Sequence, residues 1–439
     1  MVRPKGGSRV SMTSLALIGV VAMLALMLLR MPLSFCLMIV GFLGVYFALT
    51  PNAAFAVVSG DLWSQFSSYS MIVIPMYVLM GEIVFRSGIT GKLFRAAYTW
   101  VGHYRGGMLW TVILASAGFG SICGSNSATA ATIGSMALPE LKRYKYDDAI
   151  SAGSVAGGGS LGIIIPPSTV LLVIAIQAQL SIKELFLASI IPSILLVVLF
   201  LLVVWYVCRK DGSVGPASEN ASAAEKWKAI SGILPTLLLL LLVIGGLFAG
   251  WFTPTESGAV GVIGALLYAL ATRSLSWSNF KLAVTDSLRS SAMVMMLVAG
   301  ALVFGRFLTV TRLPFDIAEW VTHLPVPTLV TMAAIFIVFA IGGAIMDAFG
   351  FLLIAIPIFT PTVVQLGYDP IWFAIMMCII TSMGALTPPV GINVFVVKAL
   401  TPDVSIQQIF RGSFPYIVAY VICIAVLTLF PSMLTFVLG

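Results

Sequence analysis

Long apolar runs separated by short polar stretches fill most of the chain, and their lengths predict membrane crossings. A helix needs about 20 predominantly apolar residues to cross the hydrocarbon layer of a bilayer. The first run is long enough to remain as a crossing, so we expect no cleavable signal peptide. The predicted single crossings cover residues 10–29, 32–50, 68–86, 185–208, 233–250, 256–272, 290–308 and 413–436.

Two apolar runs in each half do not have the form of a single crossing. Residues 108–138 are too many for one crossing and too few for two, so they predict a re-entrant hairpin whose glycine and serine-rich tip is buried in protein. Residues 147–180 are apolar but contain Pro166-Pro167, which predicts a broken helix made of two half-helices. The second half repeats this pattern, with a hairpin over 328–361 and a broken helix over 371–401.

The two halves are related by a constant shift of 222 residues, which indicates an internal duplication. The shift carries Pro139 onto Pro361, Tyr146 onto Tyr368, Asp147 onto Asp369, Ser160 onto Ser382, Gly162 onto Gly384 and Pro166 onto Pro388. Because a re-entrant hairpin adds no net crossing, each copy crosses five times, and two copies in series must be inverted relative to each other. We therefore predict an all-α polytopic membrane protein with a first repeat over 1–208, a cytoplasmic linker over 209–232 and a second repeat over 233–439.

Composition supports a membrane protein and argues against other classes. Hydrophobic residues make up 60% of the 439 and charged residues 9%, whereas about a quarter of the residues in soluble domains are charged. The net charge of +7 does not indicate nucleic-acid binding, because the basic residues lie in short clusters between apolar runs. The five cysteines have neither metal-ligand nor paired spacing, and the two histidines lie in expected loops. No phosphate loop, catalytic triad or paired-carboxylate motif is present, so we expect no enzymatic activity.

The distribution of basic residues predicts the orientation of the chain. With the N-terminus outside, most of the 23 lysine and arginine residues fall in cytoplasmic loops, as the positive-inside rule requires. We therefore expect a multi-pass protein with both termini on the periplasmic side. The basic tail with Arg3, Lys5 and Arg9 runs against this orientation.

Two hairpins and two broken helices place four interruptions of backbone hydrogen bonding near the centre of the bilayer. Unwound carbonyl groups can coordinate a cation such as sodium, while the positive ends of half-helices favour the carboxylate of an anionic solute. The pattern therefore predicts the movement of a solute rather than the making of a bond.

Four motifs together resemble one family over essentially the whole chain: Gly124-Ser125-Asn126-Ser127-Ala128-Thr129, Ser160 to Ser168, Thr253-Pro254-Thr255-Glu256, and Thr387 to Asn393. They are similar to the DctM-like large membrane subunit (M) of tripartite ATP-independent periplasmic (TRAP) transporters. The resemblance implies a bacterial inner-membrane protein, an elevator-type mechanism and sodium as the coupling ion, with no other cofactor. It also implies a separate small four-helix membrane subunit (Q) and a periplasmic binding protein (P) that delivers an organic acid such as a C4-dicarboxylate or a sialic acid.

In such transporters each ion lies between a hairpin and the break of the following helix, which gives the candidate residues. The predicted sodium-site residues are Ser121, Ser125, Asn126, Gly162, Ile165, Pro166 and Ser168 in the first repeat, and Gly343, Asp347, Gly384, Thr387 and Val390 in the second. The predicted substrate-binding residues are Ser125, Asn126, Ser127, Ser168 and Asn393. We expect Thr387 to cap the helix that follows the second break, with Pro388 at its first position.

Other interpretations of these residues compete with the functional ones. Gly157 to Gly159 favour close helix packing, while Glu82 and Glu256 favour structural hydrogen bonding. Asp347 could act as a ligand or only cap the hairpin tip. At the level of the whole chain, a stand-alone sodium/anion symporter of related fold is the main alternative, an ion channel the second and an intramembrane enzyme the third. The sequence does not identify the acid, the number of sodium ions or the oligomeric state.

Overall fold

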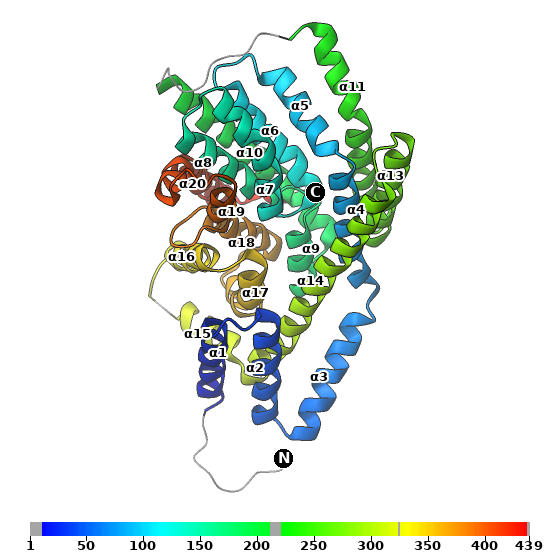
Figure 1. Ribbon diagram of the computed structural model, residues 1–439. Coiled ribbons are helices and arrows are strands. Elements are labelled where there is room, and N and C mark those ends of the chain that lie inside the picture. The colour runs from blue at the N-terminus through cyan, green and yellow to red at the C-terminus, as the bar shows by residue number, and fades with distance from the viewer. Residues whose placement is uncertain (1–10, 211–220, 324, 437–439) are drawn as a thin grey trace.

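The computed structural model describes residues 11–210, 221–323 and 325–436, and within these ranges all regular structure is helical (Figure 1). The first half contains α1 (Met12–Leu28), α2 (Leu33–Ala48), α3 (Pro51–Phe66), the 3₁₀ turn η1 (Tyr69–Ile72), α4 (Val73–Arg86), α5 (Ile89–Val101), α6 (Gly107–Cys123), α7 (Asn126–Arg143), α8 (Asp148–Gly159), the 3₁₀ turn η2 (Ser160–Ile163), α9 (Thr169–Gln177) and α10 (Ile182–Lys210). The second half contains α11 (Ala223–Leu240), the π turn η3 (Leu241–Gly245), α12 (Gly246–Phe248), α13 (Pro254–Ala271), α14 (Trp277–Thr311), α15 (Leu313–Thr322), α16 (Thr328–Ile345), α17 (Ala348–Gln365), α18 (Pro370–Gly384), α19 (Ile392–Leu400), α20 (Ile406–Leu429) and α21 (Ser432–Thr435).

The helix bounds repeat with the same shift as the sequence. Adding 222 to the ends of α7, at residues 126 and 143, gives 348 and 365, which are the ends of α17. The same shift carries α6 onto α16, α8 onto α18 and α9 onto α19 to within three residues. One pair of segments differs: Ser67, Ser68 and the turn η1 separate α3 from α4, whereas their counterpart α14 is continuous over 35 residues.

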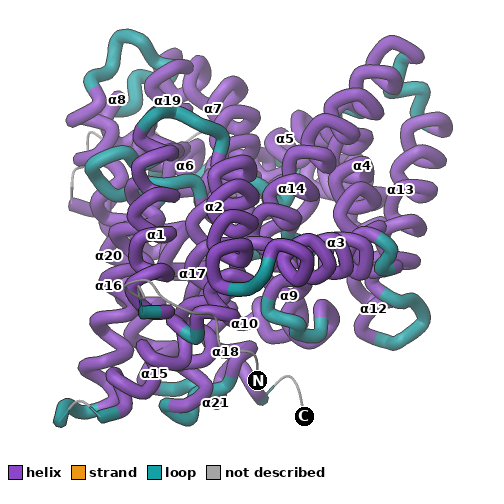
Figure 2. The backbone as a smooth tube through the Cα atoms, turned by 90° about the horizontal axis from the view of Figure 1, so that it is seen from below, coloured by secondary structure: helices purple, strands orange, loops and turns teal. Residues whose placement is uncertain are grey.

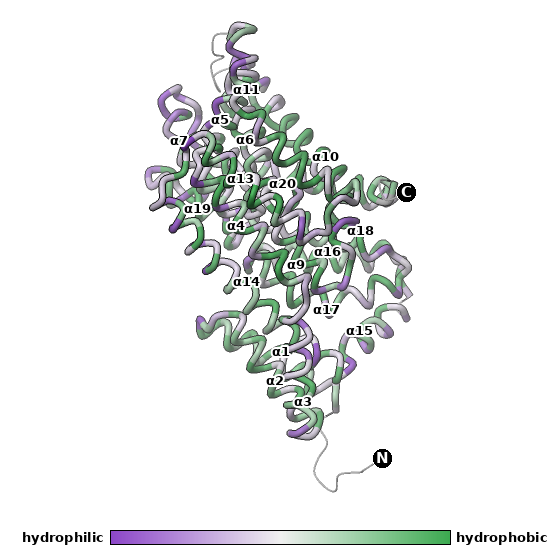
Figure 3. Tube along the Cα trace, turned by 90° about the vertical axis from the view of Figure 1, so that its right-hand side faces the viewer, coloured by the Kyte–Doolittle hydropathy of each residue, from purple (hydrophilic) through white to green (hydrophobic). Residues whose placement is uncertain are grey.

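The polytopic membrane fold is confirmed, since eight helices in the described residues are long and apolar enough to cross a membrane. Large hydrophobic side chains are exposed along these helices, as a lipid-facing surface requires, and Figure 3 shows the apolar residues running along the rods. In the second hairpin each arm reaches the length of a crossing. Arm length alone therefore does not distinguish a re-entrant hairpin from two crossings.

Several predicted bounds were wrong. The crossing expected at 290–308 begins at Trp277, where Ser276 caps the helix, and the one expected at 413–436 is α20, which begins seven residues earlier at a capping box formed by Ser405 and Gln408. Helix α11 begins at Ala223, inside the predicted linker, because Ser222 and Glu225 form a capping box. The rest of that linker, 211–220, lies outside the described residues, as does the basic tail with Arg3, Lys5 and Arg9.

The helices pack in two groups. Helices α6 to α10 contact α16 to α20, and α8 packs closely against α20. In the second group α14 contacts α2 and α4, α4 contacts α13, and α1 lies against α2. Helix α5 contacts both α11 and α6, so it borders the first group. Figure 2 shows the second group with α13 and α4 spreading to one side and α3 lying across it. The glycines 157 to 159 face Tyr416, Ser116 and Ala130 at close range, so their packing interpretation is confirmed.

Candidate functional site

The tip of the first hairpin rests on the break of the helix that follows it. Helix α6 ends at Cys123, Gly124 has a φ of +63°, and Ser125 caps α7 by accepting a hydrogen bond from the Ala128 N–H at 3.5 Å. A Cβ at Gly162, in the turn η2, would lie 2.5 Å from the carbonyl oxygen of Ser125. Only glycine therefore allows this approach.

The second hairpin also meets its own break, through different positions. Asp347 caps α17 by accepting a hydrogen bond from the Phe349 N–H at 3.1 Å. The N–H groups of Val390 and Gly391 donate to the carbonyl oxygen of Ala344 at 3.3 and 3.4 Å. A Cβ at Gly384 would lie 2.3 Å from the carbonyl carbon of Gly343, so this contact also requires glycine.

The two breaks begin differently. Ser168 caps α9 by accepting from the Leu171 N–H at 3.3 Å, and its hydroxyl donates to the Ile163 carbonyl at 2.6 Å. The equivalent of Ser168 is Val390, which has no side-chain oxygen, and Gly391 with a φ of +63° takes the cap position of α19. The prediction that Thr387 caps this helix was wrong. Thr387 lies in the turn after α18, where its hydroxyl donates to the Met383 carbonyl at 2.9 Å.

The Pro166-Pro167 and Pro388-Pro389 pairs, which predicted the breaks, occupy them. Helix η2 ends at Ile163 and α9 begins at Thr169, while α18 ends at Gly384 and α19 begins at Ile392. Both Pro-Pro peptide bonds are cis. Both broken helices are therefore present as predicted.

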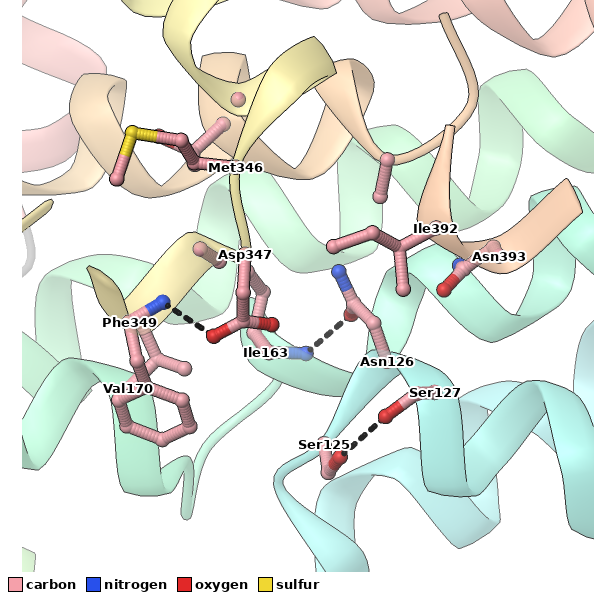
Figure 4. A pocket seen from close by; sticks show the side chains of 14 residues that line it. Ser125, Asn126, Ser127, Ile163, Val170, Met346, Asp347, Phe349, Ile392 and Asn393 are labelled. Carbon is pink, nitrogen blue, oxygen red and sulfur yellow. Dashed lines mark hydrogen bonds between the residues drawn. The ribbon is translucent and has the colours of Figure 1, made fainter. Parts of the chain in front are cut away.

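A small cavity of about 30 Å³ lies between the two hairpin tips (Figure 4). Its polar lining comes from both repeats: Ser125, Asn126, Ser127, Asp347, Thr381 and Asn393. A space of roughly 10–15 Å³ on the same measure holds a water molecule. The cavity therefore has room for a dehydrated cation or one or two waters, but not for an organic acid.

Two amide side chains are fixed at the rim of this cavity. Asn126 accepts a hydrogen bond from the Ile163 N–H at 3.1 Å and donates to the Ser382 hydroxyl at 3.1 Å, so it joins the first hairpin to both broken helices. Asn393 is fully buried, and its amide nitrogen donates to the Ala156 carbonyl at 3.2 Å. Its amide oxygen is buried without a hydrogen-bond partner among the described residues, which leaves it available as a ligand.

The predicted site residues separate into two sets. Ser125, Asn126, Ser127, Gly343, Asp347 and Asn393 line the cavity. The others, Ser121, Gly162, Ile165, Pro166, Ser168, Gly384, Thr387 and Val390, lie outside its lining, and several of them form the contacts between hairpins and breaks described above. Thr381, Ile163 and Phe349 line it without having been predicted. Thr381 lies three residues, or one helical turn, before the predicted site residue Gly384. This spacing is the only feature of the sequence from which Thr381 could have been predicted to line the cavity.

A larger cavity of about 390 Å³ adjoins the small one, and Ser125 and Phe349 line both. Its other walls come from α4, α6, α7 and α14, and include the side chain of Glu82. Arg86 forms ion pairs with Glu82 at 3.5 Å and with Asp286 of α14. The negative charge of Glu82 in the wall of the larger cavity is therefore partly neutralised by Arg86, four residues later on the same helix.

Two of the acidic residues weighed from the sequence have structural contacts. Glu256 forms a capping box with Thr253, accepting hydrogen bonds from the Thr253 N–H at 2.8 Å and from its hydroxyl at 2.9 Å. Asp347 caps α17 and also lines the small cavity, so the cap is observed and its role as a ligand stays a prediction. Outside the membrane-spanning segments, the hydrogen bond from Lys142 to Asp403, at 2.9 Å, lowers the pKa of the Asp403 carboxyl and raises the pKa of Lys142.

Comparisons with known proteins identify the family. The family model described as the DctM component of tripartite ATP-independent periplasmic transporters matches residues 20–433. The chain is 33% identical to the C4-dicarboxylate TRAP transporter large permease protein DctM of Pseudomonas aeruginosa, over 84% of this chain and 86% of that protein. It is 28% identical to the sialic acid TRAP transporter large permease protein SiaM of Vibrio cholerae, over 93% of this chain and 95% of that protein.

A solved structure supports the fold. The YdaH transporter of Alcanivorax borkumensis, described as having an unusual topology, superposes with a TM-score of 0.60 at 15% identity, covering 86% of this chain and 87% of that one. The named relatives are transporter permeases, which points away from an enzyme. With the helical membrane fold and a family match over most of its length, this chain belongs to the DctM family, the large membrane component of TRAP transporters.

Proposed function

We propose that this chain is the large permease subunit of a sodium-coupled importer of an organic acid. The observation that carries the proposal is the meeting of the two hairpin tips over one small polar cavity, each tip resting on the break of the next helix. The first turns of α7 and α17 begin at this cavity, and helix N-termini stabilise negative charge. Carbonyl, hydroxyl and amide oxygens with Asp347 are the donors that a hard cation takes.

The names of the relatives indicate the class of substrate. Among them are a C4-dicarboxylate permease, a sialic acid permease and, at 30% identity over 84% of this chain, the 2,3-diketo-L-gulonate permease YiaN of Escherichia coli. All three solutes are organic acids that carry a carboxylate. We infer a carboxylate substrate whose acid group approaches the helix N-termini, with the adjoining 390 Å³ cavity holding the rest of the molecule.

The mechanism we propose is an elevator. The group formed by α6 to α10 and α16 to α20 carries the site, while the group around α2, α4, α13 and α14 stays fixed in the bilayer. The two repeats would be inverted, with each hairpin re-entering from its own side of the membrane. The repetition of helix bounds at a shift of 222 supports this arrangement, as does a close contact of each hairpin with a glycine at its own break, Gly162 or Gly384.

We infer two partners: a separate small four-helix subunit (Q) and a periplasmic binding protein (P) that delivers the acid. A relative named the isethionate TRAP transporter permease protein DctMQ is longer than this chain, since the match covers 59% of it. The proposed location is the bacterial inner membrane, with both termini in the periplasm. Lys142 and Arg143, at the end of α7 away from the hairpin tip, would then face the cytoplasm.

Uptake into proteoliposomes tests the proposal. The chain is reconstituted with a candidate small membrane subunit and a candidate solute-binding protein. Uptake of radiolabelled succinate or sialic acid is then measured with an inward gradient of sodium or of choline. We expect uptake only with sodium and with the binding protein. Asn126→Ala and Thr387→Val should each lower the sodium-dependent rate, because the first releases the hairpin tip and the second the turn after α18.

Each alternative function predicts a different result in this assay. Sodium-dependent uptake without the binding protein would favour a stand-alone symporter, and flux that does not saturate with solute would favour a channel. Uptake that is equally fast in choline would refute sodium coupling. Full sodium dependence in both variants would remove Asn126 and Thr387 from the proposed site.

A further inference from the structure

The larger cavity of about 390 Å³ has one carboxylate and no basic side chain in its wall. Among the described residues that line it, only Glu82 carries a charge, and none is a lysine, arginine or histidine. The rest of the wall is apolar or carries hydroxyl groups, which come from Ser125, Thr132, Thr169 and Ser290. A solute in this space therefore meets one negative charge and several neutral hydroxyl groups.

The negative charge of Glu82 is only partly balanced. The side chain is 26% exposed, and Arg86 lies 3.5 Å from its carboxylate. Arg86 also donates a hydrogen bond to Asp286 of α14, and it does not line the cavity. Two carboxylates thus share one guanidinium group, which leaves one negative charge in the cluster. Glu82 is the member of the cluster that a solute in the cavity contacts.

The charges of the wall orient a bound acid. Ser125 and Phe349, in the first turns of α7 and α17, line both cavities, and the proposed function places the carboxylate of the solute at these helix N-termini. Glu82 lies on α4, which belongs to the other group of helices. The N-termini attract the acid group and Glu82 repels it. The end of the solute that lies away from its acid group therefore meets Glu82.

The chemistry of this far end is restricted by Glu82. A second carboxylate there would find no cation in the wall and would share the cavity with the Glu82 carboxylate, and like charges in a partly dehydrated site repel each other strongly. A hydroxyl group can instead donate a hydrogen bond to Glu82, and a bond to an ionised acceptor is stronger than a neutral one. The wall therefore favours hydroxyl groups over a second acid group.

We propose that Glu82 is a specificity-determining residue that restricts the solute to hydroxylated monocarboxylates and rejects dicarboxylates. The inference rests on the proposed function, from which it takes the organic acid and its place in the cavity. It narrows that function, because rejection of the wrong solute comes from a repulsive group in the wall. Of the two labelled acids in the uptake assay, sialic acid has this chemistry and succinate does not.

The test compares matched acids on the full-length protein in lipid nanodiscs. Gluconate and glucarate form one pair, 4-hydroxybutyrate and succinate the other; in each pair a terminal hydroxymethyl group of the first acid is a carboxylate in the second. Each acid is added as its sodium salt, and sodium chloride is adjusted to hold the sodium concentration constant. A bound acid raises the unfolding temperature, so the acid concentration that gives half of the maximal rise measures its affinity.

We expect the wild type to bind the hydroxyl member of a pair at a concentration at least about tenfold lower than the dicarboxylate. Glu82→Gln removes the charge and keeps the size of the side chain. In this variant the half-maximal concentration of the dicarboxylate should fall about tenfold, while that of the hydroxyl acid should change less than about threefold. Each ratio is measured within one variant, so a change in basal stability does not affect it.

Two further variants make the result specific. Glu140→Gln is the matched control, because Glu140 also pairs with an arginine of its own helix, Arg143 at 3.6 Å, but lines neither cavity. It should leave both affinities unchanged. Asp286→Asn releases Arg86 to pair with Glu82 alone, so it should also strengthen dicarboxylate binding, and it replaces Glu82→Gln if that variant does not fold.

The possible outcomes separate this inference from the proposed function. A wild type that none of the four acids stabilises refutes the proposed function itself. A dicarboxylate that binds the wild type as tightly as its hydroxyl partner overturns the role of Glu82 while leaving organic-acid transport intact. Dicarboxylate affinity that is unchanged in Glu82→Gln, or that changes equally in Glu82→Gln and Glu140→Gln, also overturns it.

Discussion

Gly384→Ala should push the second hairpin away from its break. The added Cβ would lie 2.3 Å from the carbonyl carbon of Gly343 and 2.7 Å from the Ala344 nitrogen, both main-chain atoms that cannot rotate away. Ordinary contact begins at about 3.4 Å, so the hairpin tip must move by about 1 Å. The hydrogen bonds from Val390 and Gly391 to the Ala344 carbonyl, already 3.3 and 3.4 Å long, would then break.

Two opposing effects set the size of this change. Replacing glycine by alanine in a helix stabilises it by roughly 0.5–1 kcal/mol, whereas overpacking a close contact costs about 1–3 kcal/mol. Two neutral hydrogen bonds add about 1 kcal/mol each when lost. The strain and the lost hydrogen bonds outweigh the helix gain, so we expect a net destabilisation of about 2–4.5 kcal/mol. Gly60→Ala on α3 is the control, because its new Cβ would meet nothing within 4 Å.

Thermal unfolding of the detergent-solubilised protein, followed by tryptophan fluorescence, measures the difference. Gly384→Ala should unfold at a lower temperature than the wild type, and Gly60→Ala at the same temperature or slightly above. Equal unfolding temperatures for the two variants would mean that the second hairpin does not rest on the break at Gly384.

Three further substitutions test other parts of the fold by the same measurement. Thr253→Ala should cost about 1 kcal/mol by removing the N-cap of α13. Arg306 forms two hydrogen bonds of 2.6 Å with Asp61. Arg306→Lys should therefore lower the unfolding temperature of the wild type, but not that of a protein that already carries Asp61→Asn. An equal drop in both proteins would contradict a direct contact between the two side chains. Asp403→Asn should lower the unfolding temperature slightly at neutral pH, and this difference should fade as the pH falls from about 3.9, the ordinary aspartate pKa, through the lowered pKa of the folded state. A difference of the same size in strong acid would exclude the Lys142 ion pair as its cause.

The sequence predicts the parts of this fold that depend on local backbone chemistry. Pro166-Pro167 and Pro388-Pro389 lie in the two breaks because proline cannot continue a helix, and Gly124 lies at a hairpin tip because the chain takes a positive φ there. Proline restricts the dihedral angles at its own position and glycine permits ones that other residues avoid, so the effect of both can be predicted without knowing their neighbours.

Contacts between distant segments could not be predicted in this way. Thr387-Pro388 has the form of a helix start, but the helix begins at Ile392, with Gly391 as its N-cap. The contact of Tyr420 with Ser160 and Ser382 brings together three helices, and none of these residues is unusual for its segment. Which predicted site residues line the small cavity, and which form the contacts between hairpins and breaks, also depends on tertiary packing. The spacing of residues along the sequence does not determine that packing.

The interruption between α3 and α4 makes the two halves mechanically unequal. Ser67 and Ser68 form a joint in one half, whereas the equivalent positions, 289 and 290, lie inside the 35-residue rod of α14. A continuous helix such as α14 moves as one unit, whereas an interrupted one can bend at the interruption. If the group that carries the site slides against the group around α2, α4, α13 and α14, the chain would therefore bend between α3 and α4, while α14 would stay straight.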